Sequence, residues 1–231
     1  MPKADIDKYE VKVINGEEVV VRTPQWKDKR NEIKYDFEFQ KSGLPVFCKK
    51  LTFKDYVGTD RTIPRRLKQF ATEFGDKFKD KHLYFYSKSN GTQKTTMASI
   101  LGNELIKMGY SVKFITMGDF LKDICDKNYD GDNNIDYMDF DFLIIDDAFD
   151  TKKCTISHST GYQIGYLDPI LRNRLEILGK STCFTSNIPM NEISDTFGAS
   201  IKSLIMRNCI DMEFNVSYLE SMKFDPKDLW D

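Results

Sequence analysis

The 231 residues include 34 basic and 36 acidic side chains, so the formal net charge is only −2. This balance argues against attraction of nucleic acid by the chain as a whole, and any such contact would need a local patch. The sequence has no run of 18 apolar residues and no apolar leader at its start, which predicts a protein without a membrane span or secretion signal. The five cysteines are scattered without C-x-x-C spacing, so we expect neither a zinc site nor a disulfide framework and favour a reducing, cytoplasmic location.

The first 43 residues read as a small extension. Residues 11–22 form two β-rich runs joined by Asn15-Gly16, a strong signal for a hairpin. Charged residues dominate 27–41 and predict a solvated helix, which the Ser-Gly-Leu-Pro sequence at 42–45 breaks. We therefore expect an extension over 1–43 and one larger domain over 44–231. The extension is either a decorated terminus or a docking element for a partner.

Beyond residue 44, strand and helix signals alternate along the chain. This alternation predicts a parallel sheet with crossover helices, the α/β class. Residues 148–166 are polar and predict a loop. The expected strands cover 83–86, 111–116, 140–147, 181–187 and 210–214, and the expected helices cover 61–78, the stretch from 97, 118–124, 167–178 and a short stretch after 200.

The stretch from Leu83 to Thr96 has the layout of a phosphate-binding loop. Four β-favouring residues lead into a polar turn that contains Gly91 and ends in Lys94-Thr95, and a helical pattern follows. In such a loop, backbone N–H groups at the helix start meet phosphates, the lysine reaches the β and γ oxygens, and the threonine hydroxyl holds Mg²⁺. The nucleotide-binding residues predicted here are Ser89, Asn90, Gly91, Thr92, Gln93, Lys94, Thr95 and Thr96.

The loop departs from the usual pattern at two positions, where Lys88 and Gln93 replace glycines. At the second position a positive φ would cost a non-glycine residue on the order of 1 kcal/mol. We therefore expect binding of ATP or ADP with slow hydrolysis. A turn that merely contains Lys-Thr is the alternative interpretation of the loop alone.

Two later strands end in polar side chains suited to the same site. The apolar run 140–145 ends in Asp146 and Asp147, as a buried parallel strand whose carboxyl end meets a ligand would. Asp146 would hold Mg²⁺ through water, and Asp147 would polarise the attacking water. Asn187, which follows the run 181–186, could contact the γ-phosphate or that water. The alternatives are turn residues that only cap their strands.

Three other features favour plain surface roles. Residues 126–136 begin like an EF-hand calcium loop, but Tyr137 stands where the bidentate Glu belongs, so we expect an acidic surface loop. His158 has no accompanying Ser or Cys nucleophile and is expected to be a surface residue. The basic face of the helix from residue 61 is expected to be solvated, with contact to a phosphate backbone as the alternative; it consists of Arg61, Arg65, Arg66 and Lys68.

Taken together, residues 44–218 resemble the AAA+ ATPases of the DnaC/DnaI helicase-loader and IstB family, especially loaders from phages of Gram-positive bacteria. The resemblance rests on segments 91–96 and 142–147, on Arg174 with the Phe-Thr-Ser-Asn sequence at 184–187, and on 203–209. It implies a P-loop three-layer fold with a parallel central sheet and no C-terminal helical lid. It also implies ATP or ADP with Mg²⁺ as ligands, self-association with nucleotide between neighbours, and delivery of a ring-shaped DnaB-type replicative helicase to single-stranded DNA.

In this family an arginine of one subunit reaches the nucleotide of the next. The family's usual position falls on Leu204 here, so Arg207, one helical turn later, is the substitute candidate. An exposed helix arginine is the alternative.

Two other functions stay open on the sequence. The first is an IstB-like transposition ATPase, which would associate with a transposase and DNA. The second is a non-catalytic adaptor whose altered loop binds nucleotide without turnover or no longer binds it. The sequence features do not decide between these and the loader.

Overall fold

A five-stranded parallel sheet forms the centre of the molecule. The computed structural model describes residues 9–15, 17–22, 24–126, 136–150, 160–193 and 197–215. The strand order is β4-β5-β6-β3-β7, and every neighbouring pair runs parallel. The predicted α/β class with a parallel sheet is thus confirmed. The strands are β3 (His82–Tyr86), β4 (Val112–Thr116), β5 (Phe142–Asp146), β6 (Thr182–Ser186) and β7 (Cys209–Glu213).

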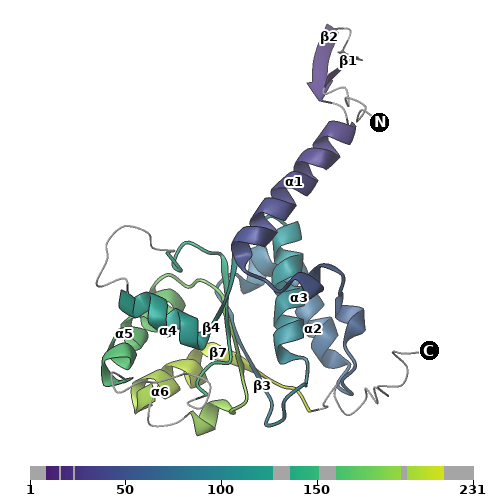
Figure 1. The fold of residues 1–231 in the computed structure, drawn as a ribbon. Coiled ribbons are helices and arrows are strands. Elements are labelled where there is room, and N and C mark those ends of the chain that lie inside the picture. The colour runs from purple at the N-terminus through teal and green to yellow at the C-terminus, as the bar shows by residue number, and fades with distance from the viewer. Residues whose placement is uncertain are drawn as a thin grey trace, which may run out of the picture.

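Helices cover both faces of this sheet, giving three layers (Figure 1). Helices α2 and α3 lie on one face, and α4, α5 and α6 lie on the other. The helices are α1 (Pro24–Ser42), α2 (Thr62–Thr72), α3 (Lys94–Lys107), α4 (Met117–Asp126), α5 (Thr160–Arg172) and α6 (Gly198–Asn208). Short helical turns are η1 (Val46–Lys49), η2 (Phe53–Asp55), η3 (Phe74–Phe78), η4 (Asn173–Ile177) and η5 (Met190–Glu192).

The two layers of helices explain why the strands are apolar without alternation. In β5, Phe142 and Ile144 pack into the core under α2 and α3, whereas Leu143 and Ile145 pack into the core under α4 to α6. Successive side chains of a strand point to opposite faces, so a strand covered on both sides needs apolar residues throughout.

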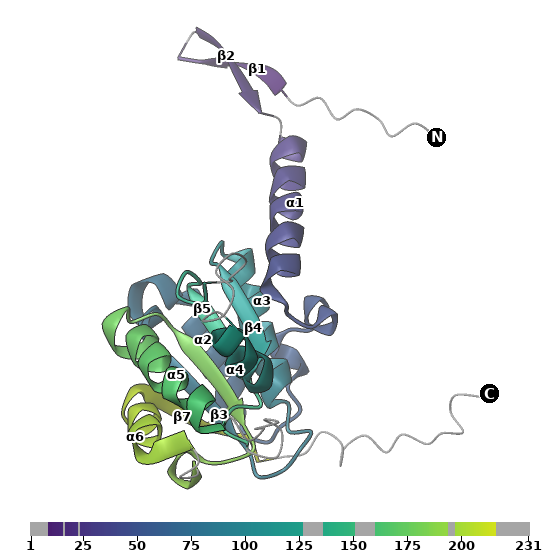
Figure 2. The same cartoon turned by 60° about the vertical axis from the view of Figure 1, so that its left-hand side comes forward.

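A separate hairpin stands at the far end of α1. Strands β1 (Tyr9–Ile14) and β2 (Glu17–Arg22) pair antiparallel, and α1 carries them away from the sheet (Figures 1 and 2). The other end of α1 packs on the main domain, where Phe39 is buried and the Tyr35 hydroxyl donates to Asn103 Oδ1 at 2.7 Å. The last turns of α1 therefore share the core of the main domain, and only the hairpin and the first part of α1 project from it.

The structure corrects two helix boundaries. Helix α5 begins at Thr160, so residues 160–166, predicted as loop, are helical. This helix is held by burial of Leu167 and Leu171, a tertiary contribution that overrides the weak helix propensity of Gly161 and Gly165. Helix α3 begins at Lys94, three residues before the predicted start. Most of the calcium-loop-like segment and His158 lie outside the described residues.

The basic side chains of α2 are exposed, as expected from the sequence. Arg61 is also tied to the chain, because its guanidinium donates to the Tyr56 carbonyl at 2.8 Å. Within the described part of the chain, no helix combines the length and hydrophobicity needed to cross a membrane.

His82, the first residue of β3, gives the fold a testable pH dependence. The ring is 2% exposed, its Nε2 lies 3.1 Å from the Leu175 carbonyl, and its Nδ1 is buried without a hydrogen bond in the described structure. Burial lowers the pKa of His82 to about 4, and the charge of Arg174 adds to this. Since an unfolded histidine has a pKa near 6.5, the unfolded chain binds the extra proton between these pH values.

We expect the free energy of unfolding to fall by up to about 3 kcal/mol between pH 7 and pH 4 because of His82 alone. Chemical denaturation at several pH values measures this. The matched variant His82→Leu removes the titrating group, so its stability should decline less steeply over the same range. Parallel pH profiles for the two proteins would contradict the assignment to His82.

Candidate functional site

Most of the predicted site residues meet at the carboxyl edge of the sheet. A cavity of about 170 Å³ there is lined by residues from three separate segments of the chain. The loop that follows β3 provides one wall, Asp147 follows β5, and Asn187 follows β6. The lining residues are Asn90, Gly91, Thr92, Gln93, Lys94, Thr95, Thr96, Asp147 and Asn187.

Lys94 is the cation of this cavity. It is 7% exposed, and its Nζ donates to the Ser89 carbonyl and to Thr92 Oγ1, each at 3.2 Å. The loop thus folds around the ammonium group, at the N-terminus of α3 where backbone N–H groups carry partial positive charge. An anion of phosphate size suits this position. Ser89 contributes through its carbonyl and does not line the cavity itself.

Thr95 and Asp146 provide adjacent oxygen atoms. The Thr95 hydroxyl donates to Asp146 Oδ1 at 2.8 Å, and the Thr185 hydroxyl donates to the same oxygen in a short hydrogen bond. Asp146 is 9% exposed and does not line the cavity itself, but it is bonded to Thr95, which does. Mg²⁺ prefers one or two protein oxygen ligands together with phosphate oxygens and water. The donor set at Thr95 and Asp146 fits that ion.

The turn after β5 is fixed against β6. Asp147 has φ of +53° and Phe149 has φ of +62°, a region that non-glycine residues rarely adopt. Three hydrogen bonds hold the turn: Asp147 N–H donates to Thr185 Oγ1 at 3.2 Å, Ala148 N–H donates to the Thr185 carbonyl at 2.7 Å, and Ser186 Oγ donates to the Ala148 carbonyl at 2.6 Å. The strained turn therefore holds Asp147 at the cavity.

Two residues at the site carried no predicted role. Thr185 links Asp146 to the turn, and Asp150 accepts a hydrogen bond from Asn187 Nδ2 at 3.5 Å. The only sequence signal for Thr185 was a hydroxyl inside a buried strand. Asp150 lies four residues after Asp146, beyond the strand end, and offered no pattern at all.

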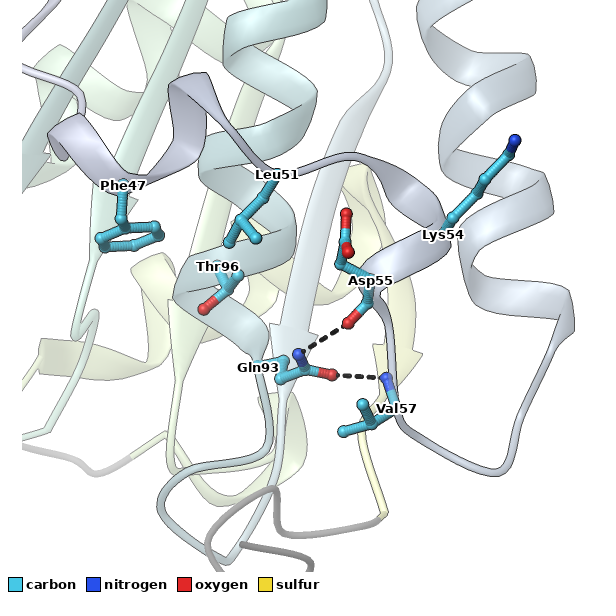
Figure 3. A pocket seen from close by; sticks show the side chains of 7 residues that line it. All are labelled: Phe47, Leu51, Lys54, Asp55, Val57, Gln93 and Thr96. Atoms are coloured by element: carbon cyan, nitrogen blue, oxygen red, sulfur yellow. Dashed lines mark hydrogen bonds between the residues drawn. The ribbon is translucent and has the colours of Figure 1, made fainter. Parts of the chain in front are cut away.

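Gln93 differs from the other loop residues in where its side chain goes. Its φ is +67°, so the residue adopts the left-handed conformation at a cost on the order of 1 kcal/mol. Its side chain leaves the loop and reaches the segment before α2, where it bonds to the backbone of Asp55 and Val57 (Figure 3). There it borders a second cavity of about 480 Å³. Gln93 and Thr96 line both cavities, so the two spaces adjoin.

Arg207 lies away from this site. It is near the end of α6, directly before β7 begins, and therefore at the amino edge of the sheet. Its guanidinium pairs with the Glu176 carboxylate, and its side chain is 61% exposed. The structure does not bring Arg207 to the cavity of its own chain.

Comparison with known proteins places the fold. No protein-family model and no curated protein matches the sequence. Among solved structures, a DnaC helicase loader superposes with a TM-score of 0.60 at 17% identity, covering 74% of this chain and 99% of that one. A DnaI structure gives 0.56 at 21% identity, covering 74% and 92%.

DnaA from Aquifex aeolicus, bound to AMPPCP, gives a TM-score of 0.57 at 22% identity. The match covers 74% of this chain but only 51% of that DnaA chain, so it spans about half of the relative's length. At these identities the likeness shows the fold alone, a three-layer α/β domain with a parallel central sheet, as the resemblance implied.

Proposed function

We propose that this protein binds ATP with Mg²⁺ and loads a replicative DNA helicase onto single-stranded DNA. The observation that carries the nucleotide part is the meeting of Lys94, the Thr95–Asp146 pair and Asn187 around one cavity at the carboxyl edge of the sheet. A triphosphate requires groups of these kinds in one place: a cation for its charge, oxygen ligands for its Mg²⁺ and an amide near its γ-phosphate.

Each residue then has a role in the proposal. Residues 89–96 cradle the phosphates, and Lys94 neutralises charge on the β and γ oxygens. Thr95 and Asp146 hold Mg²⁺, which would screen the phosphate charge when bound. Asp147 polarises the attacking water, and Asn187 positions it or the γ-phosphate. The larger cavity beside the loop, walled by Phe47, Leu51 and Val57, takes the base.

The helicase part of the proposal is supported by the fold neighbours. One neighbour, DnaC, is a helicase loader. Another is the replication initiator DnaA, in a structure bound to AMPPCP and single-stranded DNA. The proposal extends to self-association, with Arg207 of one molecule reaching the nucleotide of the next. It also includes an origin in a phage of a Gram-positive host.

The projecting hairpin is the proposed docking element. Val11 and Val20 are paired across the strands, Val13 lies on the same face as Val11, and the three side chains are 61%, 66% and 69% exposed in that order. A two-stranded hairpin is marginally stable alone, and an exposed apolar face indicates a partner surface. We assign this face to the helicase.

Changing this face should weaken capture of the helicase. The double variant Val11→Thr with Val20→Thr keeps β-favouring residues but removes two apolar contacts, for an expected loss of about tenfold or more in affinity. A pull-down against a replicative helicase measures this. Lys12→Thr, on the opposite face of the hairpin, is the matched control and should bind like the wild type. Equal capture by all three proteins would remove the hairpin from the proposal, whereas capture of a transposase in place of the helicase would favour the transposition ATPase.

The non-hydrolysing adaptor is the second candidate, and Gln93 is the observation that favours it. Its side chain occupies a position where a P-loop normally has none. Equal ATPase rates for the wild type and Lys94→Ala would support the adaptor, because a hydrolysing site depends on that lysine.

A further inference from the structure

The side chain of Gln93 makes a paired contact with the segment before α2. Its Oε1 accepts from the Val57 N–H at 2.8 Å, and its Nε2 donates to the Asp55 carbonyl at 3.2 Å (Figure 3). The contact joins positions 36 and 38 residues apart in the sequence. The receiving segment is itself fixed, since Thr52 and Asp55 form a reciprocal cap at η2.

These two backbone groups form a donor and an acceptor side by side, two residues apart on one edge of the chain. A carboxamide satisfies both because it carries an acceptor oxygen next to an NH₂ donor. The Watson–Crick edge of adenine presents the same pattern, a ring nitrogen acceptor next to an exocyclic NH₂. The edge at Asp55 and Val57 is therefore complementary to adenine as well as to the side chain that now occupies it.

The surroundings also suit a base. The cavity at this edge has apolar walls from Phe47, Leu51 and Val57, which favour a flat aromatic ring. It adjoins the phosphate-sized cavity through Gln93 and Thr96. A nucleotide with its phosphates on the loop would thus direct its base toward the bonds that Gln93 makes.

We propose that Gln93 is an internal competitor of adenine, a latch that ATP must displace to seat its base. This inference rests on the proposed function, in which residues 89–96 hold the phosphates. Because ATP must first break the two hydrogen bonds of Gln93, its affinity is lower than it would be if the Asp55–Val57 edge were unoccupied. A glycine at position 93 has no side chain and could not compete with the base in this way.

Comparison of two ligands on matched variants tests the latch. Calorimetry with Mg-ATP and with Mg-tripolyphosphate, which has no base, is run on the wild type, Gln93→Ala and Gln93→Gly. Loss of the two competing hydrogen bonds should raise affinity for ATP about tenfold in both variants. Affinity for tripolyphosphate should gain far less than affinity for ATP, because the Gln93 side chain bonds outside the phosphate loop and only a base would compete for its partners. Gln69→Ala, which removes an exposed carboxamide from α2, is the control and should change neither ligand.

The two substitutions separate the latch from backbone strain. Alanine keeps the cost of positive φ, whereas glycine relieves it. If only Gln93→Gly binds ATP more tightly, backbone conformation is the cause and the latch is refuted. A gain for tripolyphosphate equal to the gain for ATP refutes it also, because a base-free ligand cannot compete for the Asp55–Val57 edge.

Hydrogen exchange at the Val57 amide gives an independent readout. The wild type without ligand should protect this amide, Gln93→Ala should lose the protection, and ATP but not tripolyphosphate should restore it. If the wild type binds ATP and both variants bind it with the same affinity, the latch is refuted but the nucleotide site stands. Failure of all the proteins to bind either ligand would refute the proposed function itself. Melting without ligand checks that each variant is folded.

Discussion

Replacing Lys94 with alanine is expected to weaken binding of Mg-ATP about a hundredfold. The ammonium is 7% exposed, and the loop holds it through Ser89 and Thr92 at the cavity. Hydrogen bonds from a charged donor contribute up to about 3 kcal/mol, and every 1.4 kcal/mol is tenfold in affinity. Calorimetry measures the loss directly.

Thermal melting gives a second measurement of the same variant. Ligand at 100 times its dissociation constant should stabilise the wild type by about 2.7 kcal/mol, and the same concentration should leave Lys94→Ala nearly unshifted. Lys88→Ala is the matched control from the same loop. Its side chain is 71% exposed and pairs with Glu192, so its removal should change affinity by no more than about threefold. Wild-type affinity in Lys94→Ala would show that the loop does not bind the phosphates.

Replacing Arg174 with alanine is expected to cost about 3–5 kcal/mol of folding free energy. The side chain is fully buried, and its guanidinium donates to the carbonyls of Tyr137, Phe140 and Ser181 at 2.6–3.0 Å and to Thr182 Oγ1 at 3.0 Å. Burial lowers the pKa of Arg174 to about 10, so the group stays charged at neutral pH. Alanine would leave these buried acceptors without a donor.

Arg174 is placed to affect the site as well as stability. It joins the residues before β5 to the start of β6, and these two strands carry Asp146 and the segment leading to Asn187. Chemical denaturation should show the loss of free energy of unfolding. Thermal melting should show a fall of roughly 10 °C in melting temperature for a chain of this size. Arg174→Lys should recover little, because one ammonium has three donors and no planar fork.

Arg172 provides the control for Arg174. It lies two residues earlier on the same helical segment, but it is half-exposed and bonds to Asp168 and Glu176 on the surface. Arg172→Ala should lower the melting temperature far less, since exposed ion pairs contribute little. Equal melting of the wild type and Arg174→Ala would mean that the buried network does not hold the two strands.

The sequence by itself determined the local elements that carry the site. The strand, loop and helix around Lys94, the apolar strand ending in Asp146 and the polar residue after β6 all follow from short-range patterns of hydrophobicity and turn residues. Since the carboxyl ends of parallel strands share one edge, the pattern also indicated that these side chains would lie near one another.

Only the tertiary structure decided which distant residues touch. The order β4-β5-β6-β3-β7 sets β6 beside β5 and so brings Thr185 to Asp146, and no local pattern encodes that order. The reach of Gln93 to Val57 and the burial of Arg174 likewise depend on packing between segments far apart in the chain. A periodic pattern specifies which face of an element is buried, but the partner on that face is chosen by the free energy of the whole packed core.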